Sequence, residues 1–397
     1  MIARTPEEFQ QKQRIEVRLK HQVRAIDRVG KLVRVSSLDS GEEFFYPYDR
    51  LILATGARSR RLGIPGEEAS NVFTLKEMSD GIRIRKFIDQ HTPRKAVIIG
   101  AGYISLEVAE ALRERGIETT LLYRGKVPYS GLEPEVGAVI VKELDAHQVR
   151  FIGEVQPQSF QGGGQVADQL VTDQGVFSAD LFFVGVGVIP NSELARESGI
   201  TVGKSGGIQV NSLMQTSDPD IFAAGDCCEK FNRVTGQPTL APLGDIANKE
   251  GRVAGENVLG GQAEFHGIVG AACVKVFDLE IGMAGINQAQ AKRTGFSAIS
   301  QVVEGSSRVG IYPGARPTLL KIIADQSTGR LLGGNWVGWD GEARKINMLA
   351  VALHQGMTLE EISQLDLAYA PPFGPVWDPL LVAANLLKRK VKGVSVG

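Results

Sequence analysis

The chain has 397 residues, of which 43% are hydrophobic and 22% are charged. That length predicts two to four domains, at about 100–200 residues each. The 44 Lys and Arg residues balance 45 Asp and Glu residues, so the net charge of −1 gives no electrostatic argument for binding nucleic acid or an anionic membrane. The longest apolar run, 181–190, is shorter than the roughly 20 residues of a membrane-spanning helix, so we expect no membrane segment.

The N-terminal segment carries Glu7 and Glu8 where a signal peptide would have an apolar core. Three cysteines, two of them adjacent, do not make a disulfide framework, and the five histidines show no metal-binding spacing. We therefore expect a reducing, cytoplasmic location and no bound metal.

Strand patterns alternate with helical spacing along the first half of the chain. Residues 14–36 alternate weakly and indicate strands, and 48–57 are typical of a buried strand that runs into a glycine turn. Lys76 to Gln90 have the apolar spacing of a helix. A strand over 96–99, a helix over 102–115 and a strand over 119–122 then form a βαβ unit, and the apolar run 181–187 adds a further strand.

The second half begins with a short apolar strand over 221–224. A helix follows from about Pro242 to Leu259, and Pro242 suits its first turn, where the missing N–H costs nothing. From about residue 264 the pattern predicts strands, a helix near 341–355 and a closing segment rich in Pro and Trp.

A glycine turn over 100–105 follows the strand at 96–99 and opens a helix. Gly100 makes the tight turn, Gly102 lets a pyrophosphate approach, and the helix N-terminus supplies N–H groups with positive partial charge. Ser105 replaces the third glycine of the usual pattern and is small enough for helix–strand packing. The strand before it and the helix after it favour dinucleotide binding over a purely structural turn.

The end of the next strand carries Tyr123 and Arg124, with Lys126 two residues beyond, where an acid would select NAD. No carboxylate there repels a 2′-phosphate and Arg124 can pair with one, which favours NADPH. The alternative is that Arg124 stacks on adenine and NADH is accepted too. Glu107, on the helix after the glycine turn, is either a polar group near the nicotinamide or a solvated helix acid.

A second glycine turn, Gly225-Asp226, ends the strand at 221–224. Gly225 lets a ligand approach the backbone, and Asp226 offers an acceptor for a sugar or ribityl hydroxyl. The adjacent Cys227 and Cys228 are interpreted as small buried fillers rather than a redox pair, since their disulfide ring would be strained. Cys273, inside the apolar segment 271–277, is interpreted as a core residue.

The order of segments 48–57, 96–107, 186–191, 216–226 and 368–379 resembles the FAD-dependent pyridine nucleotide-disulfide oxidoreductases, and within them the coenzyme A-disulfide reductase and NADH oxidase branch. The resemblance covers essentially the whole chain. It implies an α/β fold with two Rossmann-like domains, of which the FAD domain is incomplete, and a C-terminal α+β dimerisation domain. The implied division is 1–73 and 191–262 for the FAD-binding domain, 74–190 for the NAD(P)-binding domain and 263–397 for the dimerisation domain.

The resemblance also implies cofactor-binding residues. For FAD they are Ala54, Thr55, Gly56, Gly225, Asp226, Ala241, Pro242 and Leu243. For NADPH or NADH they are Gly100, Gly102, Tyr103, Ile104, Ser105, Glu107, Tyr123, Arg124 and Gly187. Tyr312 and Tyr369, the catalytic candidates, match tyrosines that approach the partner subunit's substrate or flavin, which implies a homodimer. From their chemistry alone these two tyrosines either bind a ligand or simply pack.

The chain departs from this family in its first residues. Family members begin with a flavin-binding strand, glycine turn and helix, and a single reactive cysteine follows; residues 3–7 match the segment beyond that cysteine, so both are absent from the chain as written. A basic residue expected in some members is Trp377 here, which weakens the coenzyme A assignment.

The main interpretation is an oxidoreductase that passes a hydride from NAD(P)H to flavin and on to a small-molecule acceptor: a disulfide of the coenzyme A type, polysulfide or oxygen. One alternative is a non-catalytic, dimeric remnant that binds NAD(P)H but does not hold FAD. Another is a flavoprotein subunit completed by a second polypeptide. Without the cysteine, which disulfide exchange needs as a thiolate, we expect oxygen or a quinone to take the electrons rather than coenzyme A disulfide.

Overall fold

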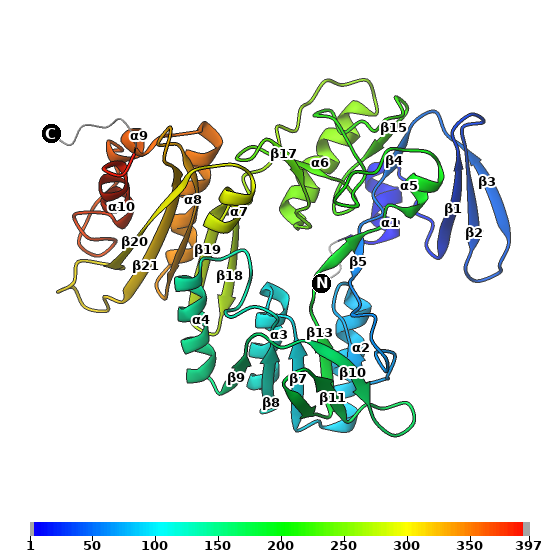
Figure 1. Cartoon of the computed structure of the whole chain (residues 1–397). Coiled ribbons are helices and arrows are strands. Elements are labelled where there is room, and N and C mark those ends of the chain that lie inside the picture. Colours follow the sequence, from blue (N-terminus) through cyan, green and yellow to red (C-terminus); the bar gives the residue numbers. More distant parts are fainter. Residues whose placement is uncertain (1–3, 392–397) are drawn as a thin grey trace. The chain divides into compact units, whose positions relative to one another are not determined.

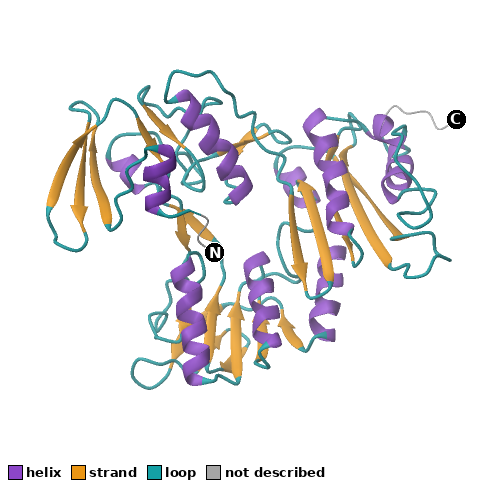
Figure 2. Ribbon diagram, turned by 180° about the vertical axis from the view of Figure 1, so that it is seen from behind, coloured by secondary structure: helices purple, strands orange, loops and turns teal. Residues whose placement is uncertain are grey.

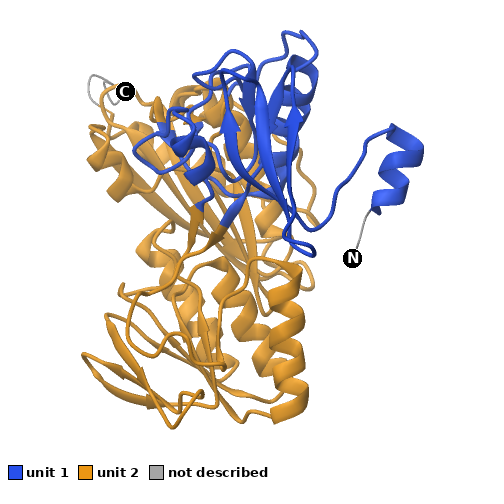
Figure 3. Cartoon of the chain, turned by 90° about the vertical axis from the view of Figure 1, so that its right-hand side faces the viewer, with its two compact units in different colours: residues 1–57, 190–230, 238–266 blue, residues 58–189, 231–237, 267–397 orange. Residues whose placement is uncertain are grey.

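The computed structural model describes residues 4–391, which form two compact units (Figure 3). Unit 1 contains the N-terminal residues up to Ala57 together with Pro190–Lys230 and Pro238–His266. Unit 2 contains Arg58–Ile189, Phe231–Gln237 and the chain from Gly267 onward. Each unit combines helices with sheets, so the α/β expectation is confirmed. The division into four domain segments is finer than these two units and stays a prediction.

Unit 1 joins a parallel strand pair to an antiparallel sheet. The pair is β4 (Leu51–Leu53) and β15 (Ile221–Ala223), in the register Leu51 to Ile221 and Leu53 to Ala223. The antiparallel sheet has the order β1-β2-β3, formed by His21–Asp27, Leu32–Ser37 and Glu43–Pro47. The helical segments of unit 1 are α1 (Pro6–Glu8), η1 (Phe9–Gln13), α5 (Glu193–Glu197) and α6 (Gly244–Asn257).

The first part of unit 2 is a parallel sheet with the order β6-β13-β7-β8-β9. Its strands are Val72–Phe73, Leu181–Val184, Lys95–Ile99, Glu118–Leu122 and Val149–Ile152, and its helices are α2 (Met78–His91), α3 (Tyr103–Glu114) and α4 (Pro134–Ala146) (Figure 2). Continuous apolar runs such as Leu181–Val184 form these strands because both faces of a parallel sheet are covered. A small antiparallel sheet, β10 (Pro157–Gln161), β11 (Gln169–Thr172) and β12 (Gly175–Ser178), is inserted before β13.

The C-terminal part of unit 2 is an antiparallel sheet with the order β18-β19-β22-β21-β20 (Figure 1). Its strands are Ala272–Val276, Leu279–Gly285, Leu331–Gly338, Pro317–Asp325 and Ala298–Ser306. Helix α8 (Glu342–Gln355) packs on β19 and β22, and α10 (Pro379–Lys388) packs on β20 and β21. The remaining helices of this part are α7 (Gln288–Arg293) and α9 (Leu359–Ser363).

The chain passes between the two units five times, four of them within short strands and once between His266 and Gly267. The strands are β5 (Ala57–Ser59), β14 (Val188–Pro190), β16 (Lys230–Asn232) and β17 (Gln237–Thr239).

Most expected elements are confirmed, and the differences have local causes. Residues 14–20 are not strand, because the backbone is left-handed at Arg14 and again at Lys20, and β1 begins only at His21. The strand expected over 48–57 is reduced to β4, since only Leu51–Leu53 pair with β15. The placement of Pro242 in a first helical turn is wrong: Leu243 is the extended N-cap of α6, so Pro242 precedes the helix.

Candidate functional site

A cavity of about 670 Å³ lies at the carboxyl ends of β7, β8 and β13 in unit 2, and we call it the unit 2 cavity. In open α/β sheets this edge is where ligands bind. Five of the residues expected for the pyridine nucleotide line the cavity. They are Gly100, Gly102, Tyr123, Arg124 and Gly187.

The glycine turn at the cavity is fixed by close backbone packing. Gly100 has φ 101°, and a Cβ there would lie 2.3 Å from the Gly185 carbonyl oxygen, so only glycine fits. Gly102 is the N-cap of α3, and a Cβ at this position would meet no atom within 4 Å, so its approach to the cavity is open. Ser105 is fully buried and its Oγ donates to the Gly185 carbonyl at 3.3 Å, which is the helix–strand packing expected of it.

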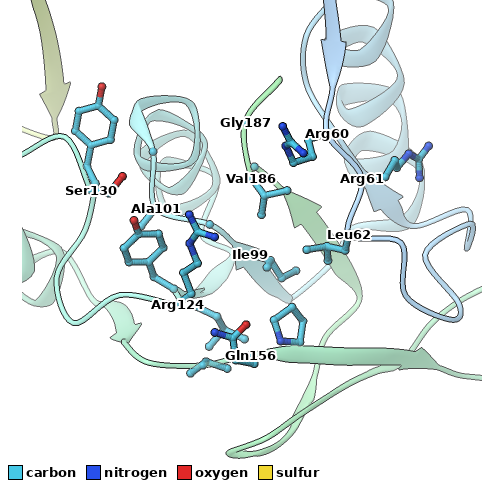
Figure 4. Close-up of a pocket in the computed structure, with 18 of the residues that line it drawn as sticks. Arg60, Arg61, Leu62, Ile99, Ala101, Arg124, Ser130, Gln156, Val186 and Gly187 are labelled. Carbon is cyan, nitrogen blue, oxygen red and sulfur yellow. The ribbon is translucent and has the colours of Figure 1, made fainter. Parts of the chain in front are cut away.

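Basic side chains lie at both ends of the unit 2 cavity. In Figure 4, Arg124 and Ser130 lie toward one end and Arg60 and Arg61 toward the other. The Arg60 backbone N–H donates to the Gly187 carbonyl at 2.9 Å, which joins the two segments of that end. The cavity therefore offers cationic groups and a helix N-terminus, the features that bind phosphates.

Four other residues expected at the nucleotide site, Tyr103, Ile104, Ser105 and Glu107, do not line this cavity. Glu107 is exposed on α3, and partial desolvation, followed by the nearby Glu110 carboxylate, raises the pKa of its carboxyl group. Other lining residues lie outside the glycine-turn motif and were not expected from the sequence. They include Arg60, Arg61, Tyr129, Ser130 and Gln156. The sequence does hold one indication of these residues: Arg60 and Arg61 are adjacent and follow the glycine turn at Gly56, so they could have been expected to bind phosphate.

In unit 1 the parallel pairing of β4 with β15 places the ends of both strands side by side. Ala54, Thr55 and Gly56 follow one strand, and Gly225 and Asp226 follow the other. Thr55 Oγ1 donates to the Asn191 carbonyl at 2.5 Å. Gly56 and Gly225 both have positive φ, so both turns adopt a conformation that favours glycine. Ala241, Pro242 and Leu243 lie just before α6 in the same unit.

A buried ion pair between Lys230 and Glu250 bonds to the backbone of the Gly225 turn. Lys230 Nζ lies 3.3 Å from Glu250 Oε2, with side chains 1% and 0% exposed. Glu250 Oε2 also accepts from the Gly225 N–H at 2.8 Å, and Lys230 donates to the Gly225 carbonyl at 2.5 Å. Burial raises the pKa of Glu250, although Lys230 opposes the shift. Neither Lys230 nor Glu250 was expected from the sequence to support this turn.

Cys227 and Cys228 are both buried, as expected, with their Sγ atoms 3.7 Å apart. The hydrogen bond between the two thiols lowers the pKa of Cys227. The same hydrogen bond, together with burial, raises the pKa of Cys228. Cys273 is exposed, so its assignment to the core is wrong. Along β18 the buried side chains alternate, and Val274 and Val276 face the core while Cys273 and Lys275 face outward.

The residues present in unit 1 fit part of a flavin. The open Gly56 turn, the Gly225 turn and the Asp226 carboxylate at one strand edge suit a ribityl chain and its ring.

Tyr312 and Tyr369 lie in the C-terminal part of unit 2 and are both exposed. The Val309 N–H donates to the Pro371 carbonyl at 3.2 Å, so the loops that carry the two tyrosines are adjacent. His354 is exposed near the end of α8.

Within residues 4–391, no group of three or more His, Cys, Asp or Glu side chains is placed to hold a metal ion. None of the helices in this range has both the length and the apolarity needed to cross a membrane.

Residues 2–244 match the family model described as pyridine nucleotide-disulphide oxidoreductase, and residues 271–379 match its dimerisation domain. The chain is 36% identical over 384 residues to an NAD(P)H coenzyme A polysulfide/persulfide reductase of Pyrococcus horikoshii, covering 96% of this chain and 85% of the relative.

Two solved structures have closely similar folds. The NAD-dependent persulfide reductase from A. fulgidus has a TM-score of 0.94 and 35% identity, covering 98% of this chain and 72% of that one. The water-forming NADH oxidase from Lactobacillus brevis bound to NADH has a TM-score of 0.92 and 27% identity, covering 97% of this chain and 85% of that one. With the glycine turns and strand edges described above, these matches show that the chain belongs to the pyridine nucleotide-disulphide oxidoreductase family, whose cofactors are FAD and NAD(P)H, and is an oxidoreductase.

Proposed function

We propose that the chain binds NADPH in preference to NADH in the unit 2 cavity and delivers a hydride from it, through a flavin, to a small-molecule acceptor. The observation that carries the proposal is the glycine turn at a cavity lined by Arg124, where no acidic side chain stands at the end of β8. Gly100 and Gly102 allow the diphosphate close to the α3 N-terminus, and Arg124 pairs with the 2′-phosphate.

Bound flavin supplies the two-electron chemistry that links a nicotinamide to the acceptor. The residues of unit 1 would hold the flavin: Asp226 would accept a hydrogen bond from its ribityl chain, and the N-terminus of α6, preceded by Ala241, Pro242 and Leu243, would offer positive partial charge to its ring. The Lys230–Glu250 pair keeps the Gly225 turn in place.

We propose oxygen as the acceptor that takes the electrons directly. The likeness in fold to the water-forming NADH oxidase from Lactobacillus brevis supports this choice. Cys227 and Cys228 are fully buried, whereas disulfide exchange requires an accessible thiolate. Sulfur acceptors are the second candidate, favoured by the names of the Pyrococcus and A. fulgidus relatives.

The test is NADPH oxidation by the purified protein, after its visible absorption spectrum has been recorded. We expect flavin bands and turnover with oxygen, and no thiol-dependent turnover with coenzyme A disulfide. A colourless protein that binds NADPH would support the non-catalytic alternative. Robust reduction of coenzyme A disulfide or polysulfide under anaerobic conditions would replace oxygen by a sulfur acceptor.

A further inference from the structure

One wall of the unit 2 cavity is a loop in a conformation that its own residues do not favour. The loop is Tyr129–Glu133, called the wall loop, and Tyr129 and Ser130 line the cavity. Tyr129 has φ 57°, in the left-handed region that a bulky side chain rarely adopts. Such a backbone persists only where the surrounding structure holds it.

Hydrogen bonds from the C-terminal part of unit 2 fix the wall loop in this conformation. Asn287, the N-cap of α7, donates from Nδ2 to the Ser130 carbonyl at 2.8 Å while its Oδ1 accepts from the Gln290 N–H. At the other end of the loop, the Glu133 N–H donates to Asn335 Oδ1 on β22 at 2.8 Å. The C-terminal part thus bonds to both ends of the wall loop.

A buried ion pair adds to these hydrogen bonds. Lys321 Nζ on β21 lies 2.6 Å from Glu133 Oε2, with side chains 5% and 3% exposed. The other oxygen of Glu133 accepts from the Gln288 N–H at 2.6 Å. Lys321 also lies 2.8 Å from Glu135, on the first turn of α4. A buried charge that loses its partner is strongly unfavourable, so this pair keeps the end of the loop against the sheet.

We propose that Asn287 and Lys321 are positioning residues for pyridine nucleotide binding, although neither lines the cavity. They hold the wall loop in its cavity-forming conformation before the nucleotide arrives, so binding does not have to order it. This inference rests on the proposed function of the unit 2 cavity as the nucleotide site.

The test compares dissociation constants of the purified, flavin-loaded protein for NADPH and NADH, measured by fluorescence titration, with melting temperatures measured alongside. Asn287→Asp keeps the oxygen that caps α7 and puts an acceptor where the Ser130 carbonyl needs a donor. Lys321→Met removes the charge partner of Glu133. We expect both variants to raise both dissociation constants by about tenfold, the loss of one buried hydrogen bond or more, and to leave the NADPH:NADH ratio unchanged.

Lys275→Met is the matched control. Lys275 also joins the C-terminal sheet to the nucleotide-binding part, through Glu110 at 2.7 Å, but its side chain is exposed and neither residue lines the unit 2 cavity. Its dissociation constants should equal those of the wild type.

Unchanged dissociation constants in Asn287→Asp would overturn the inference, whether or not the variant melts earlier, and that variant decides if Lys321→Met does not fold. Failure of the wild type to bind either nucleotide would instead remove the proposed function, and the inference with it.

Discussion

Gly100 and Gly102 stand two residues apart in one turn, yet the structure gives them different tasks. Gly100 is required by the fold, because its φ of 101° and the Gly185 carbonyl leave no room for a side chain. Gly102 has an ordinary φ of −79° and open space, so the fold accepts a larger residue there. We propose that the small size of Gly102 leaves room for a ligand to approach, so adding one methyl group at each position separates the two roles.

Gly100→Ala should lower the free energy of unfolding by about 2–4 kcal/mol, from backbone strain and overpacking. Gly102→Ala should change it by less than about 0.5 kcal/mol and still weaken NADPH binding, because its methyl group occupies the diphosphate approach. Urea unfolding and NADPH titration of both variants measure the two effects. Equal stability losses in the two variants would contradict this separation.

Arg124→Glu should lower the NADPH:NADH ratio of kcat/KM at least about tenfold, since a charge-assisted pair becomes a repulsion. Steady-state kinetics with each nucleotide measure the ratio. Lys126→Glu is the matched control: it makes the same charge change two residues away but lies outside the cavity lining, and it should leave the ratio unchanged. An unchanged ratio in Arg124→Glu would mean that Arg124 does not recognise the phosphate.

At the scale of elements, strands and helices with a clear apolar period could be predicted from the sequence, and their ends could not. The strand 96–99 and the helix 102–115 correspond to β7 and α3. The exposure of Cys273 was predictable from Lys275 two residues later, which marks the outward face of β18. The end of β4 could not be predicted from the sequence, because it depends on pairing with β15, which is distant in sequence.

Helix α6 supports the Gly225 turn through its buried Glu250, which is paired with Lys230. Lys230→Met should lower the free energy of unfolding by about 3–5 kcal/mol, as expected when a buried pair loses one partner. Lys249→Met, on the same helix but in the exposed pair with Asp245, should change it by less than about 1 kcal/mol. Urea unfolding distinguishes the two, and similar losses would contradict a special role for the buried pair.

The loss in Lys230→Met should also depend on pH. Burial already raises the pKa of Glu250 in the folded protein, and removal of Lys230 raises it further. A raised carboxyl pKa favours the folded state fully below the ordinary pKa of glutamate, and that contribution is lost as pH rises through the folded value. The deficit of Lys230→Met relative to wild type should therefore be smallest in acid and grow toward neutral pH. A deficit independent of pH would contradict the buried-charge explanation.

For the whole molecule, the sequence identified the family and the glycine turn that lines the unit 2 cavity, but not the grouping of the chain into units. The C-terminal sheet shares unit 2 with the parallel sheet through contacts such as Lys321 with Glu133. No periodicity could reveal this pairing, since its residues are 188 positions apart (321 − 133). The lining residues Tyr129 and Ser130 escaped prediction for the same reason: tertiary contacts, rather than a motif, place their loop.

The match of 271–379 to a dimerisation domain suggests a homodimer, and the closing segment exposes large apolar side chains that a partner subunit would cover. Trp377 is 68% exposed and Phe373 lies nearby in the sequence, also exposed.

Trp377→Glu should raise the dimer dissociation constant by at least about tenfold, the typical effect of losing a buried aromatic anchor. It should leave NADPH affinity unchanged, because Trp377 does not line the unit 2 cavity. Sedimentation velocity over a range of concentrations measures the dimer. Leu259→Glu places the same charge at an 88% exposed apolar residue of unit 1 and should leave association unaltered; equal dimer stability in both variants would move the interface away from Trp377.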